Sequence, residues 1–87
     1  MEVILLSKAA KYLAGTNEPA KSRLIKALSK LEEEPPRGDI IPLKGEKNRF
    51  RLVVGGYRAL FTYDEAGRIL VTDIDVRGQI YKHGRAK

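Results

Sequence analysis

The fold is decided by residues 49–76, which read RFRLVVGGYRALFTYDEAGRILVTDIDV. From position 49 to position 54, every second side chain is apolar and would share one face of a strand, while the opposite face would carry Arg49 and Arg51. Gly55-Gly56 is typical of a two-residue hairpin turn, and residues 64–67 carry a second turn signal. The sequence therefore predicts an antiparallel three-stranded meander over residues 49–54, 57–63 and 68–76.

The chain opens with a short apolar run, Glu2–Leu6, which we interpret as a strand. Ser7 is predicted to cap a helix that has residues 8–14 as its body and Gly15 as its end. This helix comes directly after the strand, so the two elements would form one compact N-terminal unit.

A second helix is predicted to begin near Asn17, a plausible cap, with Pro19 in its first turn. Its apolar residues recur at helical spacing and form one stripe: Ala20, Leu24, Ala27, Leu28 and Leu31. Pro35-Pro36 ends the helix, because the residue before a proline is disfavoured in helical geometry. Residues 37–47 are rich in Gly, Pro and charge, and are predicted to be a loop.

Strands and helices are segregated along the chain, which indicates an α+β fold rather than a doubly wound parallel sheet. We expect an N-terminal strand, a two-helix hairpin and the three-stranded meander to form one sheet with the helices packed on one face. The first strand should pair with one of the others. The length of 87 residues predicts a single domain, residues 1–87.

The formal net charge of +6 is concentrated in the second half of the chain. Residues 1–43 hold seven basic and six acidic side chains, whereas residues 44–87 hold ten basic and five acidic ones. A localised positive field favours an anionic partner, with nucleic acid first among the candidates. A solubilising surface charge would give the same composition.

Several classes of site are excluded by composition. The chain has no cysteine, so a disulfide framework and a thiol nucleophile are impossible, and its single histidine, His83, leaves too few ligands for a metal cage. No Gly-rich phosphate loop precedes a helix, and no cofactor is expected. The N-terminal apolar run is too short for a signal peptide or a membrane span, so a soluble, cytoplasmic protein is expected.

The remaining chemistry lies in a cluster of arginines on the predicted sheet. Arg49 and Arg51 leave the same face, Arg58 follows a hairpin turn onto the neighbouring strand, and Arg77 ends the next strand with Tyr81 four residues later. Guanidinium groups bind phosphate and stabilise added negative charge, and a tyrosine can stack on a base. Each arginine alone could equally be a solvated residue or a surface ion-pair partner, but four on one sheet favour an anion site.

Three stretches together resemble the RelE/ParE toxin superfamily: Leu43-Lys44-Gly45, then residues 49–58 with the pattern G-x-Y-R, then Arg77-Gly78-Gln79-Ile80-Tyr81. The resemblance covers nearly the whole chain, because the length and the order of elements also match. Each short motif is weakly specific alone, and the series in this order is specific for the superfamily rather than for one activity.

The resemblance implies a toxin of a type II toxin–antitoxin system that cleaves messenger RNA in the ribosomal A site, without a metal, by attack of the RNA 2′-hydroxyl on its own phosphate. In that reading Arg58 and Arg77 hold the scissile phosphate, Tyr81 stacks on or assists at the cleaved nucleotide, and Arg51 completes the catalytic group. The residues implied to bind RNA phosphates are Lys44, Lys47, Arg49, Arg51 and Lys82.

Two departures from the family pattern bear on the activity. Val76 stands where many members have His or Lys, and both basic strand positions are arginines, which stay protonated at any working pH. No general base is therefore evident. Two alternatives stay open: a ParE-like inhibitor of DNA gyrase, and a non-catalytic binder of RNA or the ribosome.

The resemblance also implies a protein partner. The expected partner is a RelB-like antitoxin, an acidic and partly disordered chain with an amphipathic helix that folds on binding. Ribosome and messenger RNA would be the other partners, and a heteromeric toxin–antitoxin complex is expected.

Overall fold

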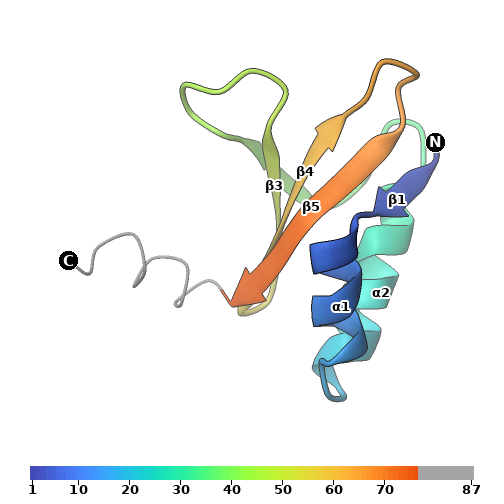
Figure 1. The fold of residues 1–87 in the computed structure, drawn as a ribbon, viewed down its shortest axis with the longest axis vertical. Coiled ribbons are helices and arrows are strands. Elements are labelled where there is room, and N and C mark those ends of the chain that lie inside the picture. The colour runs from blue at the N-terminus through green and yellow to red at the C-terminus, as the bar shows by residue number, and fades with distance from the viewer. Residues whose placement is uncertain (77–87) are drawn as a thin grey trace.

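A computed structural model describes residues 1–76 of the chain. Its elements are β1 (Val3–Leu5), α1 (Ser7–Ala14), α2 (Ala20–Lys30), β2 (Asp39–Pro42), β3 (Phe50–Val54), β4 (Tyr57–Tyr63) and β5 (Ile69–Val76). The five strands form one sheet in the order β1-β5-β4-β3-β2. β1 runs parallel to β5, and all other neighbours are antiparallel. The two helices lie together on one side of the sheet (Figure 1).

The predicted α+β class is confirmed, as are both turns of the meander. Gly55 in the β3–β4 turn has φ +59, and Gly67 in the β4–β5 turn has φ +84. Both values lie in the left-handed region that glycine enters without a Cβ penalty. The first strand pairs with the last, as β1 aligns Val3 with Ile69.

The core lies between the helices and one face of the sheet. The apolar stripe of α2 supplies Leu24 and Leu28, with Leu31 just beyond the helix end, and the sheet supplies Leu52, Ala59, Phe61, Ile69, Val71 and Ile74. The ring of Phe61 stacks on Phe50 with centroids 5.4 Å apart and meets Tyr63 edge-on at 6.0 Å. The alternation that the sequence shows in β3 therefore follows from burial of one face.

The prediction that residues 37–47 form only a loop is wrong. Residues 39–42 are β2, an edge strand that pairs antiparallel with β3. Ile40 faces Leu52 and packs against the core, whereas Ile41 faces Arg51 and is 38 % exposed. Pro42 ends the strand, at an edge position where its missing N–H does no harm.

Both predicted helix caps are also wrong. Ser7 is the first residue of α1 and Leu6 occupies the N-cap, while Pro19 rather than Asn17 precedes α2. The first turn of α2 instead uses Glu18, whose Oε1 accepts hydrogen bonds from the Ser22 backbone N–H (3.1 Å) and hydroxyl (2.6 Å). These bonds hold the pKa of Glu18 below its usual value.

α1 occupies the edge of the sheet that β1 leaves open. β1 pairs only with residues 69–71 of β5, and the Leu6 N–H donates to the Val71 carbonyl (2.9 Å) as the chain turns into the helix. α1 then runs beside the second half of β5 (Figure 1).

Neither helix within residues 1–76 is long and apolar enough to cross a membrane.

Candidate nucleic-acid interface

The sheet face opposite the core carries three of the four predicted arginines, Arg49, Arg51 and Arg58. Arg51 lies in a row across the sheet with Ile41 and Leu60, and Leu60 is in turn opposite Asp73. The adjacent row on this face runs through Asp39, Val53, Arg58 and Asp75. Because residues two apart on a strand share a face, Arg49 joins Arg51 at the start of β3. We call this surface the arginine face, with Arg49, Arg51 and Arg58 as its cations.

These side chains lie partly out of water. Arg58 is 7 % exposed, and the side chain of Arg49 is 36 % exposed. The Nε atoms of Arg49 and Arg51 are buried and have no hydrogen-bond partner among residues 1–76. An anion bound here would meet guanidinium groups in a medium of lower dielectric than bulk water, where their attraction is stronger.

Carboxylates interleave with these cations. Asp73 accepts hydrogen bonds from Lys8 Nζ (2.8 Å) and from the Thr72 hydroxyl (2.9 Å). The Lys8 hydrogen bond is the main cause of a lowered Asp73 pKa, and Thr72, Lys8 charge and Arg49 act in the same direction. The same pair raises the pKa of Lys8. Arg49 also pairs with Glu46, with Nη1 and Oε1 3.7 Å apart.

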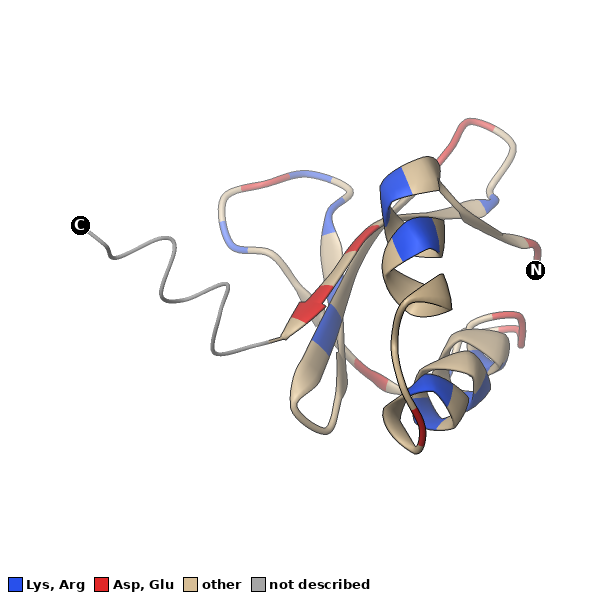
Figure 2. Cartoon of the chain, turned by 60° about the horizontal axis from the view of Figure 1, so that its bottom comes forward, with Lys and Arg blue, Asp and Glu red and all other residues tan. Residues whose placement is uncertain are grey.

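The loop from Leu43 to Asn48 extends this surface beyond the sheet. It connects β2 to β3 and carries Lys44 and Lys47, both exposed. Figure 2 shows basic residues in this loop and on the strands, with acidic positions between them. The structure thus brings Arg49, Arg51 and Arg58 onto one face with the two lysines beside it. Arg77, Tyr81, Lys82 and His83 lie outside the described residues.

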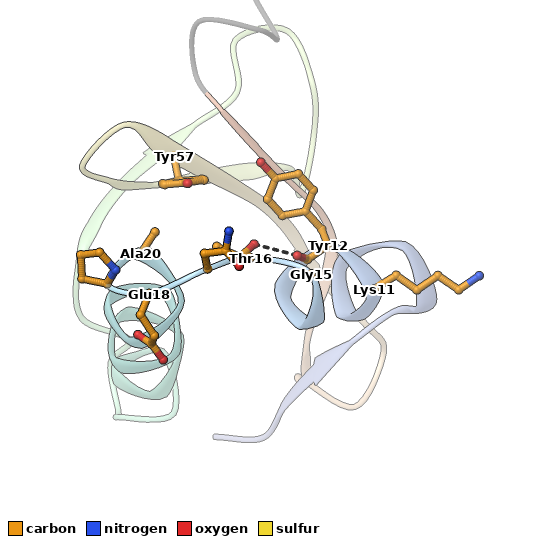
Figure 3. Close-up of a pocket in the computed structure, with 9 residues that line it drawn as sticks. Lys11, Tyr12, Gly15, Thr16, Glu18, Ala20 and Tyr57 are labelled. Atoms are coloured by element: carbon orange, nitrogen blue, oxygen red, sulfur yellow. Dashed lines mark hydrogen bonds between the residues drawn. The ribbon is translucent and has the colours of Figure 1, made fainter.

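An open groove of about 620 Å³ lies between the α1–α2 connection and the β3–β4 hairpin. Tyr12 and Tyr57 line it with rings edge to face, centroids 6.4 Å apart (Figure 3). The Thr16 hydroxyl donates to the Tyr12 carbonyl (2.7 Å), and burial, with Asp75 and Tyr57 nearby, raises the Tyr12 pKa. Sequence reasoning missed this groove, because no local pattern shows that position 12 meets position 57.

Residues 6–81 match the family model of the ParE toxin of type II toxin–antitoxin systems, parDE. The chain belongs to this family of toxins. The match spans most of the chain: it begins at Leu6, directly after β1, and includes both helices and the whole arginine face. The resemblance to the RelE/ParE superfamily is thereby confirmed.

Solved toxin–antitoxin complexes have the same fold. The RelB–RelE complex of Methanococcus jannaschii aligns with a TM-score of 0.76 and 19% identity over 92% of this chain and 96% of that one. The archaeal RelE–RelB complex of Pyrococcus horikoshii OT3 gives 0.73 and 25% over 90% and 96%. RelBE2 of Mycobacterium tuberculosis gives 0.72 and 19% over 87% and 96%. No curated protein matches the chain.

Proposed function

We propose that this ParE-family chain is a ribosome-dependent endoribonuclease that cleaves messenger RNA in the A site. The observation that carries the proposal is the clustering of Arg49, Arg51 and Arg58 on one sheet face. A cluster of partly buried guanidiniums next to two exposed lysines suits an RNA backbone, which presents a phosphate at every nucleotide.

In the proposed reaction the RNA 2′-oxygen forms a bond to the adjacent phosphorus while the bond from phosphorus to the 5′-oxygen breaks. The products are a 2′,3′-cyclic phosphate and a free 5′-hydroxyl. The 2′-hydroxyl gives up its proton to a base, and the leaving oxygen takes one up. Arg58 stabilises the extra negative charge on the non-bridging oxygens of the reacting phosphate, and Arg51 binds a neighbouring phosphate. Arg77 and Tyr81 enter only through the family pattern, as a second phosphate ligand and as a stacking or proton-transferring group.

Catalysis at such a site rests on positioning and electrostatics rather than on a strong base. The arginines stay protonated at any working pH and cannot accept the 2′-hydroxyl proton. The ribosome would hold the messenger in the reactive geometry, a contribution that can replace part of the chemical catalysis. The reaction as proposed requires no metal.

We further propose that residues 1–87 act as one cytoplasmic toxin domain held inactive by an antitoxin. The three solved structures compared above are complexes of a toxin with its antitoxin. This chain exposes apolar side chains that a partner helix would cover, among them Leu6 at 39% and Ile25 at 48%. A shallow groove of about 210 Å³ between β1, α1 and α2 is lined by Ile25 and Val3. An acidic amphipathic helix fits an apolar groove on a basic protein.

The test is cleavage of messenger RNA on programmed ribosomes, followed by primer extension. Wild type should cut in the A site only when ribosomes are present. Arg58→Ala should reduce the rate by about a hundredfold or more, the usual cost of a lost charge-stabilising group. Arg23→Ala, which removes an exposed arginine of α2, should cleave at the wild-type rate.

Gyrase inhibition is the second candidate, because the matching family model is that of the ParE toxin. A supercoiling assay separates the two functions. Inhibition of gyrase by a wild-type protein that leaves messenger RNA intact would establish this candidate instead. Binding to ribosomes without cleavage or gyrase inhibition would identify a non-catalytic RNA binder.

A further inference from the structure

Asn48 has an unusual backbone conformation immediately before the arginine face. Its φ is +56, the only positive value among the non-glycine residues of positions 1–76. Asparagine enters the left-handed region more readily than other residues with a Cβ, and single residues adopt it where the surroundings hold them there. The position therefore needs a reason in its contacts.

The Asn48 side chain pairs with β4 as a backbone would. Nδ2 donates to the Tyr63 carbonyl (2.7 Å), and the Tyr63 N–H donates to Oδ1 (3.0 Å). The backbone carbonyl of Asn48 also accepts a hydrogen bond from the Thr62 hydroxyl. Three hydrogen bonds thus join position 48 to the last two residues of β4, beyond the Phe50–Phe61 pair that ends the β3–β4 ladder.

Arg49 is consequently held from both sides. Asn48 fixes it against β4, and the Arg49 carbonyl accepts the Leu43 N–H (2.9 Å) on the β2 side. Its guanidinium lies next to Glu46 and has a buried Nε with no hydrogen-bond partner in the described part of the chain. A long, flexible side chain of this kind binds an anion more tightly when its backbone is already fixed.

We propose that Asn48 is a positioning residue for RNA binding, which acts by holding Arg49 on the arginine face. It makes no contact with RNA itself. The inference rests on the proposed function, in which Arg49 binds a phosphate. Both polar atoms of the Asn48 side chain are hydrogen-bonded to Tyr63 of β4, so Asn48 affects RNA binding only through Arg49.

A double-mutant cycle tests the proposal. The probe is a short fluorescent 2′-O-methyl RNA, which has no free 2′-hydroxyl and so cannot be cleaved. Its affinity is measured by fluorescence anisotropy for four full-length proteins: wild type, Asn48→Gly, Arg49→Ala and the double variant. Glycine accepts the positive φ, so only the amide contacts are lost. Asn48→Gly should weaken binding about fivefold in wild type and less than about twofold in Arg49→Ala, because neighbours that act as a unit are not additive.

The salt dependence separates positioning from a loss of stability. Each phosphate contact contributes about 0.7 to the slope of log K against log salt for a single strand. Asn48→Gly should lower the slope by about that amount although no charge has been removed. Thr62→Val, which removes the hydrogen bond from the Thr62 hydroxyl to the Asn48 carbonyl, should also weaken RNA binding, by a smaller factor than Asn48→Gly. Asn17→Gly, the same change at the other asparagine, should leave both readings unchanged.

The outcomes are distinct for the two proposals. Equal losses from Asn48→Gly with and without Arg49, or an unchanged salt slope, would overturn the positioning role while wild-type binding and cleavage stand. A wild type that binds no free RNA would overturn the role of Asn48, whereas the proposed function is decided separately by cleavage on programmed ribosomes. Urea denaturation of each variant confirms that the binding reaction contains folded protein.

Discussion

Replacing Asp73 with Asn should strengthen RNA binding, although the substitution breaks contacts. Asp73 shares the arginine face with Arg51, separated from it by Leu60 on the strand between them. Its carboxylate carries a full negative charge at neutral pH, because Lys8 first, and Thr72 and Arg49 with it, lower its pKa. Phosphates held by the arginines would be repelled by this charge, and the Asn variant removes the repulsion.

The size of the effect follows from the sheet geometry. Neighbouring strands are about 4.8 Å apart, so Asp73 lies about 10 Å from a phosphate over Arg51. Two unit charges at that distance interact by about 0.4 kcal/mol in water and about 1.7 kcal/mol at an effective dielectric of 20. These values correspond to about twofold and 17-fold in affinity. The Asp73 side chain is 28% exposed, and salt screens charges about 10 Å apart, so about threefold is expected at low salt.

Anisotropy with the fluorescent 2′-O-methyl RNA measures this directly, and the gain should shrink as salt is added. Glu65→Gln, the same loss of charge in the exposed β4–β5 turn, is the matched control and should give less than half the gain. Weaker binding by Asp73→Asn would refute the reasoning, because it would mean that Asp73 orders the face rather than opposing the ligand.

Three further outcomes are expected. Arg51→Gln should lower the salt slope for RNA binding by about 0.7, and Arg23→Gln on α2 should leave it unchanged; equal slopes would place the phosphates elsewhere. Phe61→Leu should cost about 2 kcal/mol in urea denaturation, since the ring is fully buried and meets two others. The pKa of Asp64 is lowered, chiefly by the hydrogen bond from the Arg68 backbone N–H. The ionised Asp64 carboxylate therefore stabilises the fold above about pH 4, and this stabilisation is lost as the pH falls through the lowered pKa. Asp64→Asn should therefore flatten the fall in stability below about pH 4, and an unchanged acid profile would contradict this.

The alternation of apolar and polar residues predicted the meander strands correctly, because burial of one sheet face requires that alternation. β4 has its predicted bounds, residues 57–63, and the period-two alternation placed Arg49 and Arg51 on the face opposite Leu52. A one-residue shift would have exposed Leu52, so the register had one solution. The cluster of three arginines followed from that register and from the Gly55-Gly56 turn.

Other features depend on contacts that no local pattern records. β2 has two apolar residues, Ile40 and Ile41, between Asp39 and Pro42, and it forms only because β3 offers an edge to pair with. The ion pair of Lys8 with Asp73 joins residues 65 positions apart, and Asp73 lies just beyond residues 69–71, the part of β5 that pairs with β1. The Asn48 amide bonds to Tyr63, 15 positions away, so its role depends on the folded sheet and is not visible in the loop sequence around it.

The presence of aspartates among the arginines of the arginine face has a physical explanation under the proposed function. Arg49, Arg51 and Arg58 lie close together on a surface from which water is partly excluded, so their mutual repulsion would destabilise the free protein. Asp73 and Asp75 lie on β5, next to Arg58 on β4 and two strands from Arg51 on β3, and their charges offset that repulsion. Phosphates can replace the carboxylates as counter-charges when RNA binds. On this argument the acids weaken RNA binding and stabilise the unbound fold, so neutralising either one should move affinity and stability in opposite directions.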